Sequence, residues 1–179
     1  MIVPEGLSFI VPLAVAVAVA FFYDIHILAV FLLLLLLFVV NFFRNPERVF
    51  QGEERALLSP ADGRVIRVDD EASHELLDES CRKISIFMNV FNVHVNRAPC
   101  SGVIESIRYK KGEFLSAGKD AASEQNEKNA VVIRTGGGRK LVTVQVAGLI
   151  ARRIVCWVKE GMEVRKGERF GMIRFGSRL

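Results

Sequence analysis

The sequence predicts a mainly β domain, of barrel or sandwich type, preceded by an N-terminal hydrophobic helical segment in a membrane. Only eight of the first 43 residues fall outside the apolar class, and no Lys or Arg occurs before Arg44. After residue 43, short apolar runs alternate with glycine-containing turns, which is typical of all-β barrels and sandwiches. No long amphipathic helical pattern occurs in residues 44–179.

The N-terminal segment, residues 1–43, is predicted to be a membrane anchor, either one tilted span or a helical hairpin. Its two apolar runs are Leu7–Tyr23 and Ile25–Phe43. Each is close to the roughly 20 residues that cross a bilayer. A hairpin would place Asp24 and His26 at its tip, away from the bilayer centre, where a charge is costly. A buried hairpin of a soluble fold is the alternative. A cleaved signal peptide fits poorly, because the basic residues follow the apolar run.

Charge is unevenly distributed along the chain. The formal net charge is +4, yet Glu5 and Asp24 are the only charged residues among the first 43. Arg44, Arg48 and Arg55 follow the apolar run closely, so the positive-inside rule predicts that the β domain lies on the cytoplasmic side of the cell membrane. The basic surplus is modest and lacks interleaved aromatic residues. It therefore favours attraction to an anionic membrane over binding to nucleic acid.

The β domain is expected to occupy residues 44–179. Glu71–Glu79 is predicted to be a loop or one helical turn, and Phe114–Asn129 an irregular excursion. The glycines at 136–138 lead into a strand, whereas a phosphate-binding loop needs a Lys-Ser/Thr pair and a helix, so they predict a hairpin turn. The predicted strands are Arg64–Val68, Ile84–Val95 with a bulge, Gly102–Tyr109, Ala130–Arg134, Lys140–Val146, Ile150–Val158 and Met172–Phe175.

Cys81, Cys100 and Cys156 are far apart in the sequence and odd in number. No pair has the spacing of metal ligands, so no metal site is expected. In a cytoplasmic domain these residues are most simply reduced thiols of the core.

Three further residues look ordinary when each is taken alone. Asp62 lies in a Pro-Ala-Asp-Gly turn, His94 lies in a strand-like run, and Ser177 follows Gly176 near the end of the sequence. Turn aspartates and single strand histidines are usually structural. Composition and spacing alone therefore predict a membrane-tethered β domain and no chemistry.

Taken together, four stretches resemble the short, prokaryotic type of phosphatidylserine decarboxylase proenzyme. They are Ser-Pro-Ala-Asp-Gly at 59–63, Met-Asn-Val-Phe-Asn-Val-His-Val-Asn-Arg at 88–97, Ala-Gly-Leu-Ile-Ala-Arg-Arg-Ile at 147–154 and Gly-Glu-Arg-Phe-Gly-Met-Ile-Arg-Phe-Gly-Ser-Arg at 167–178. Glu-Gln-Asn-Glu-Lys-Asn at 124–129 is similar to the family's Asn-Glu segment. Each stretch alone is weak, but their order and number make the resemblance specific. It implies a barrel-sandwich-like β domain that processes itself.

The resemblance also implies the chemistry. The Ser177 hydroxyl would attack the Gly176 carbonyl, and elimination and hydrolysis would convert Ser177 into a pyruvoyl group on the smaller of two subunits. Asp62, His94 and Ser177 are the implied catalytic residues, with His94 as the base and Asp62 orienting it. The pyruvoyl group, without a metal, would then serve as the electron sink that decarboxylates phosphatidylserine to phosphatidylethanolamine in phospholipid biosynthesis.

The sequence departs from the family pattern at two places. Phe91 stands where some relatives carry a second histidine, so a role for such a histidine does not transfer. The sequence stops at Leu179, two residues after Ser177. Family members continue there with a strand-bearing small subunit, so the β domain is expected to be cut short just after the self-cleavage site. Arg152 and Arg153 are candidates for binding the substrate phosphate or carboxylate, with outward-facing strand residues as an equal alternative.

Other functions stay open at this point. One is a membrane-tethered barrel-sandwich binding or carrier module without catalysis, and another is a structural protein with a membrane anchor. A carrier would need an exposed lysine in a tripeptide such as Met-Lys-Met, which does not occur. A decarboxylase of a related serine lipid, such as archaetidylserine, is a third alternative. A homo-oligomer is compatible with each of them.

Overall fold

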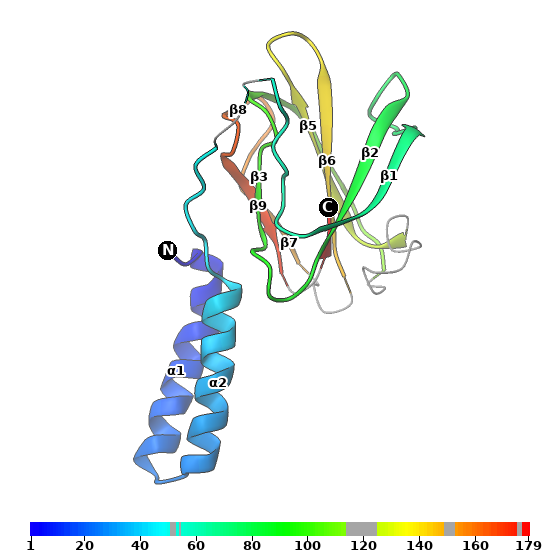
Figure 1. Ribbon diagram of the computed structural model, residues 1–179. Helices are drawn as coiled ribbons and strands as arrows, with labels where there is room; N and C mark the ends of the chain where they lie inside the picture. Colours follow the sequence, from blue (N-terminus) through cyan, green and yellow to red (C-terminus); the bar gives the residue numbers. More distant parts are fainter. Residues whose placement is uncertain (51–52, 54, 114–124, 149–152, 175–176) are drawn as a thin grey trace. The chain divides into compact units, whose positions relative to one another are not determined.

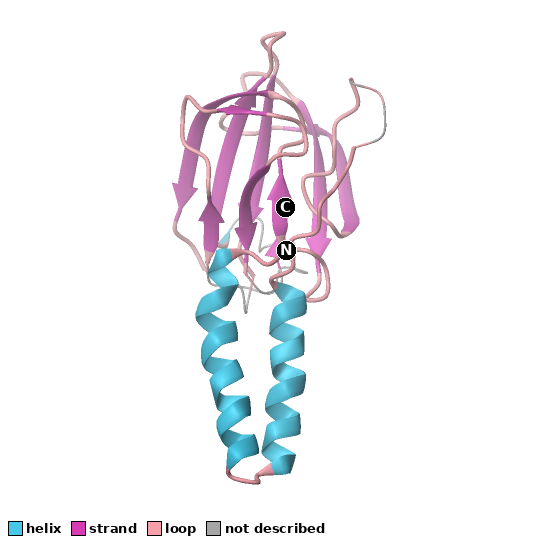
Figure 2. Ribbon diagram, turned by 90° about the vertical axis from the view of Figure 1, so that its left-hand side faces the viewer, coloured by secondary structure: helices cyan, strands magenta, loops and turns pink. Residues whose placement is uncertain are grey.

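The computed structural model describes residues 1–50, 53, 55–113, 125–148, 153–174 and 177–179, with the backbone alone described for Ser177. The chain divides into two compact units, Met1–Glu47 and Arg48–Leu179. The first unit is helical and the second is built from strands (Figures 1 and 2).

The N-terminal unit is a helical hairpin. After the short 3-10 helix η1 (Pro4–Gly6), helix α1 (Leu7–Phe22) and helix α2 (His26–Phe42) lie side by side, drawn in cyan in Figure 2. The chain reverses at Asp24, whose φ of 56° is the left-handed conformation that Asp tolerates in turns. The 19 residues of η1 and α1 are long and apolar enough to cross a membrane, while α2 is apolar but shorter.

The second unit is mainly β, as the sequence predicted. A seven-stranded antiparallel sheet has the order β1-β2-β10-β6-β5-β4-β8, and a three-stranded antiparallel sheet has the order β3-β9-β7 (Figure 1). The strands are β1 Arg64–Ala72, β2 Cys81–Met88, β3 Val95–Arg97, β4 Gly102–Lys110, β5 Lys128–Arg134, β6 Lys140–Val146, β7 Ile154–Cys156, β8 Glu163–Val164, β9 Arg169–Ile173 and β10 Ser177–Arg178.

The prediction of one long strand over Ile84–Val95 is wrong. Strand β2 ends at Met88 and β3 begins at Val95 in the other sheet. The cause is a side-chain-stabilised turn between them. The Asn89 backbone N–H donates to Asn92 Oδ1, and the Phe91 N–H donates to Asn89 Oδ1, both at 2.9 Å. Asn side chains favour such turns over a continuous ladder, so the shift in the apolar pattern marked a turn and not a bulge.

The other predicted elements differ from the structure mainly in length. Strand β6 has the predicted bounds, and the glycine hairpin before it closes through a 2.9 Å bond from Thr135 N to Arg139 O. Within the described residues, strand β7 covers only Ile154–Cys156 of the predicted Ile150–Val158, whose first three residues lie outside the described part of the chain. The two-residue strands β8 and β10 were not predicted, because two residues carry no periodic signal. Most of the predicted excursion after residue 113 lies outside the described residues.

The core of the β unit fills the space between the two sheets. Phe170 of β9 packs against Ile104 of β4 and Ile133 of β5, and all three are fully buried. A second cluster joins Met88 of β2 to Ile173 of β9 and Leu179. Burying these side chains contributes roughly 1.5–3 kcal/mol each. The second cluster therefore packs β2 and β9 against the C-terminal residue, close in sequence to the predicted catalytic residues His94 and Ser177.

Candidate functional site

One end of the β unit brings together the segments that carry the predicted site. Met88, the last residue of β2, pairs with Ser177 of β10, and Val146, the last residue of β6, pairs with Arg178. The carbonyl of His94 accepts a 3.2 Å hydrogen bond from Ile173 N at the end of β9. The His94 and Ser177 backbones are therefore both anchored where β2, β6 and β9 end. Gly176 lies outside the described residues.

Strand β10 is held firmly although it is short. Arg178 is buried, and Leu179 exchanges two backbone hydrogen bonds with Ile86 of β2, at 2.7 and 2.9 Å. The C-terminal residues consequently lie between β2 and β6 (Figure 1). This pairing fixes the backbone that follows the predicted scissile bond.

His94 is completely buried, with 0% of its surface exposed. Its Nδ1 lies 2.9 Å from the backbone oxygen of Asn92. A carbonyl oxygen only accepts hydrogen bonds, so Nδ1 carries a hydrogen, and in the neutral ring Nε2 keeps its lone pair. This tautomer leaves Nε2 able to accept a proton, which is the property that a general base needs.

Asp62 lies in a turn attached to the strand that follows His94. The Arg97 N–H of β3 donates to the Pro60 carbonyl at 2.9 Å. The Asp62 side chain is 39% exposed, and its Oδ2 binds Arg48 Nη2 at 2.5 Å. Burial lowers the pKa of Arg97, the nearby Arg169 and Arg48 lower it further, and Asp62 opposes this change. Asp62 thus carries negative charge into a basic region, and its orienting effect on His94 stays a prediction.

Sequence reasoning missed three buried amide side chains beside this site, those of Asn96, Asn129 and Gln145. They form a hydrogen-bonded chain through the interior. Asn96 and Asn129 lie in the stretches that resemble the family, but amides are usually exposed in folded proteins, so nothing in the sequence indicated that the three would meet in the interior. Of the two arginines proposed for the substrate, Arg152 lies outside the described residues, whereas Arg153 is exposed. Their role in binding stays a prediction.

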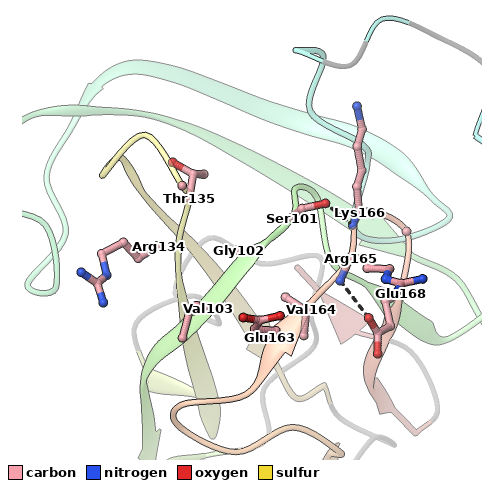
Figure 3. Close-up of a pocket in the computed structure, with 12 residues that line it drawn as sticks. Ser101, Gly102, Val103, Arg134, Thr135, Glu163, Val164, Arg165, Lys166 and Glu168 are labelled. Carbon is pink, nitrogen blue, oxygen red and sulfur yellow. Dashed lines mark hydrogen bonds between the residues drawn. The ribbon is translucent and has the colours of Figure 1, made fainter.

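A pocket lies at the other end of the β unit. Its volume is about 1140 Å³, and it is lined by the start of β4, the end of β5 and the turn after β8. Figure 3 shows the Arg165 N–H donating to the Glu168 carboxylate there, at 2.8 Å. None of Asp62, His94 and Ser177 lines this pocket. Within the described part of the chain, no three His, Cys, Asp or Glu side chains form a candidate metal site.

The three cysteines are free thiols. Cys100 is buried, and burial raises the pKa of its thiol. Cys81 and Cys156 are half-buried.

Comparison with known proteins places the chain in a family. The model of the family described as phosphatidylserine decarboxylase matches residues 35–179. Three relatives, each named phosphatidylserine decarboxylase proenzyme, come from Syntrophus aciditrophicus, Geotalea uraniireducens and Burkholderia pseudomallei. Identity to the first is 56%, over 98% of this chain and 83% of the relative. Identity to the second is 54%, over 86% of this chain and 71% of the relative. Identity to the third is 51%, over 82% of this chain and 67% of the relative. The resemblance seen in the sequence is therefore confirmed, and the chain belongs to the phosphatidylserine decarboxylase family.

Proposed function

We propose that this chain is a proenzyme that cleaves itself between Gly176 and Ser177 and then decarboxylates phosphatidylserine to phosphatidylethanolamine. The observation that carries the proposal is the environment of His94. Its ring is buried, and its Nδ1 is bound to a backbone oxygen in the turn that follows the strand paired with Ser177. Membership of the family and the names of the relatives support the same reaction.

Self-cleavage starts with proton transfer from the Ser177 hydroxyl to Nε2 of His94. Serine is a weak nucleophile and needs such a base. The serine Oγ bonds to the Gly176 carbonyl carbon, and the C–N bond breaks as nitrogen takes the proton, which leaves an ester. Loss of the Ser177 α-hydrogen then breaks the Cβ–Oγ bond, so Gly176 leaves as a carboxylate. Water replaces the nitrogen of the resulting dehydroalanine, releases ammonia and leaves a pyruvoyl group. Asp62 is proposed to orient the His94 ring for this transfer.

The residues present fit a pyruvoyl group formed at this position. It would remain on β10, where pairing with Met88 and the burial of Arg178 hold the backbone. When present, the group supplies a carbonyl that accepts the electrons released with CO2. The chain's own contribution would be the buried His94 imidazole, which would hold a proton at Nε2 and donate it to the carbon that has lost CO2. The proposal involves no metal.

The helical unit suits a lipid substrate. We propose that it anchors the chain in the cell membrane with the β unit on the cytoplasmic side, since the basic residues follow α2. Tethering keeps the catalytic unit beside anionic phosphatidylserine, which is negligibly soluble in water. Archaetidylserine has the same headgroup as phosphatidylserine. Decarboxylation assays run in parallel on the two lipids would show which of them is the substrate.

The test compares His94→Gln with His74→Gln, a matched control because His74 is the other histidine of the β unit and lies in a half-buried turn. Intact-mass analysis of the folded proteins should show the wild type and His74→Gln shortened by the residues after Gly176. His94→Gln should cleave at least about 100-fold more slowly than the wild type, because a general base usually contributes a factor of this size or more. Cleavage of His94→Gln at the wild-type rate would refute the assignment.

The decarboxylation is measured separately, as CO2 released from phosphatidylserine vesicles. Borohydride, which reduces a pyruvoyl carbonyl, should abolish this activity in the cleaved protein. Activity that survives borohydride would contradict the pyruvoyl group while leaving self-cleavage intact.

A further inference from the structure

Three amide side chains form a continuous hydrogen-bonded chain inside the β unit. Asn129 Nδ2 donates to Gln145 Oε1 at 2.9 Å, and Gln145 Nε2 donates to Asn96 Oδ1 at 2.9 Å. Asn96 Nδ2 then lies 4.0 Å from the sulfur of Met88. Asn96 and Gln145 are 0% exposed and Asn129 is 3% exposed. Burying three amides is costly unless they bond to one another, so the chain is a specific feature of this interior.

The amide chain connects the two sheets at the catalytic end. Asn129 and Gln145 are cross-strand partners in the seven-stranded sheet, whereas Asn96 lies in the three-stranded sheet, two residues after His94. Gln145 precedes Val146, the partner of Arg178, and Met88 is the partner of Ser177. The strand that follows His94 is thereby joined to both strands that flank β10.

The hydrogen bond from Gln145 to Asn96 requires the two sheets to approach each other closely. The Gln145 side chain reaches across to Gly171 of β9, and a Cβ at Gly171 would lie only 2.8 Å from Gln145 Nε2. Gln145 Nε2 is also 3.4 Å from the Val155 carbonyl of β7. Apolar contacts are non-directional, whereas hydrogen bonds of 2.9 Å weaken steeply when their distance or angle changes. The amides consequently define one relative position of the two sheets.

We propose that the Asn129–Gln145–Asn96 chain is a positioning device, which holds β3 and its preceding histidine in register with β10 for self-cleavage. The inference rests on the proposed function of His94 and Ser177. The three amides act through the strands that carry them and contact no reacting atom in this role. Misplacing a catalytic group by about 1 Å can cost roughly 100-fold in rate, so the expected effect is large.

The first experiment compares Gln145→Met with Thr143→Val. Methionine keeps the length of glutamine but removes its hydrogen bonds with Asn129, Asn96 and the Val155 carbonyl. Thr143 is buried two residues earlier on the same face of β6, and within the described chain its hydroxyl has no hydrogen-bond partner. Cleavage at Gly176–Ser177 should be at least tenfold slower in Gln145→Met and unchanged in Thr143→Val. Rates are measured on folded protein, so a lower melting temperature with wild-type cleavage would overturn the proposal.

The variant Gln145→Glu tests the donor specifically. A protonated glutamic acid can donate to Asn96 Oδ1 and accept from Asn129. In the ionised form, the carboxylate oxygen that faces Asn96 Oδ1 is an acceptor, so two acceptors oppose each other and this hydrogen bond is lost. The ratio of variant to wild-type cleavage rate should therefore rise as the pH falls. A ratio that does not change with pH contradicts a role for the Gln145 donor.

A second readout does not depend on cleavage. The chain has three histidines, so ¹⁵N spectra of selectively labelled protein can be assigned with His74→Gln. The His94 ring should show a protonated Nδ1 in the wild type and altered or broadened signals in Gln145→Met. Unchanged His94 signals together with wild-type cleavage would refute the inference. If the wild type itself is not cut at Gly176–Ser177, the proposed function fails, and the spectra still decide whether the amides position His94. Asn129→Leu replaces Gln145→Met if that variant does not fold.

Discussion

Replacing Gly171 by alanine should destabilise the β unit, although the strand context alone suggests the opposite. Glycine within a strand is unfavourable by roughly 0.5–1 kcal/mol relative to alanine, so the substitution would normally stabilise. Gly171 pairs with Asn96 on one side and Cys156 on the other. A methyl group there would overlap the Val155 carbonyl oxygen and lie 2.8 Å from Gln145 Nε2. The first neighbour is backbone of the three-stranded sheet and cannot move away independently.

The magnitude follows from these two neighbours. Overpacking a tight interior costs about 1–3 kcal/mol, and the gain in strand propensity offsets part of it. We expect Gly171→Ala to lower the free energy of unfolding by about 1–2 kcal/mol, taking these ranges together. For a unit of this size the melting temperature should fall by roughly 3–8 °C.

The assay is thermal and urea unfolding in detergent, followed by fluorescence of the single tryptophan, Trp157, whose N–H donates to Phe170 O at 2.8 Å. Gly136→Ala is the matched control, because a Cβ at Gly136 meets nothing within 4 Å. The control should stay within about 0.5 kcal/mol of the wild type. If Gly171→Ala is as stable as the wild type or more stable, the sheets do not approach each other as closely as the structure indicates.

Two further predictions follow from shifted pKa values. Burial raises the pKa of the Cys100 thiol, so Cys100 should react with iodoacetamide more slowly than the half-buried Cys81 at neutral pH, with a rate that increases as the pH rises. Peptide mapping by mass spectrometry measures both rates, and equal rates would contradict the burial of Cys100. A 2.9 Å contact with Glu105 raises the pKa of Lys140, so Glu105→Gln should lower the midpoint of the Lys140 titration observed by NMR. Because the pKa of Lys140 is raised in the folded state, the ion pair stabilises the fold below the ordinary lysine pKa and loses that contribution as the pH rises through the raised value. If Glu105→Gln leaves the midpoint of the Lys140 titration unchanged, the contact is absent in solution.

Local sequence patterns predicted the structure correctly where a single short segment determines it. Two apolar runs separated by Asp24 and His26 indicated the helical segment, and the glycine turn before β6 indicated its hairpin. The same reasoning failed between β2 and β3, because apolar alternation cannot distinguish one bulged strand from two strands joined by a turn. There the side chains of Asn89 and Asn92 determine where the chain leaves the sheet.

By itself, the sequence determined that an apolar helical segment precedes a mainly β unit, and its motifs identified Asp62, His94 and Ser177 as the implied catalytic residues. Those properties depend on local composition and on short stretches of residues in a particular order. Only the tertiary structure decided that Asn92 fixes the tautomer of His94, and that amides from three strands meet inside the core. The amide contacts join residues distant in sequence, whereas the His94 contact is local but depends on a turn that the apolar pattern did not reveal. Burial makes both kinds of contact matter, because a polar group removed from water must find its partner within the fold.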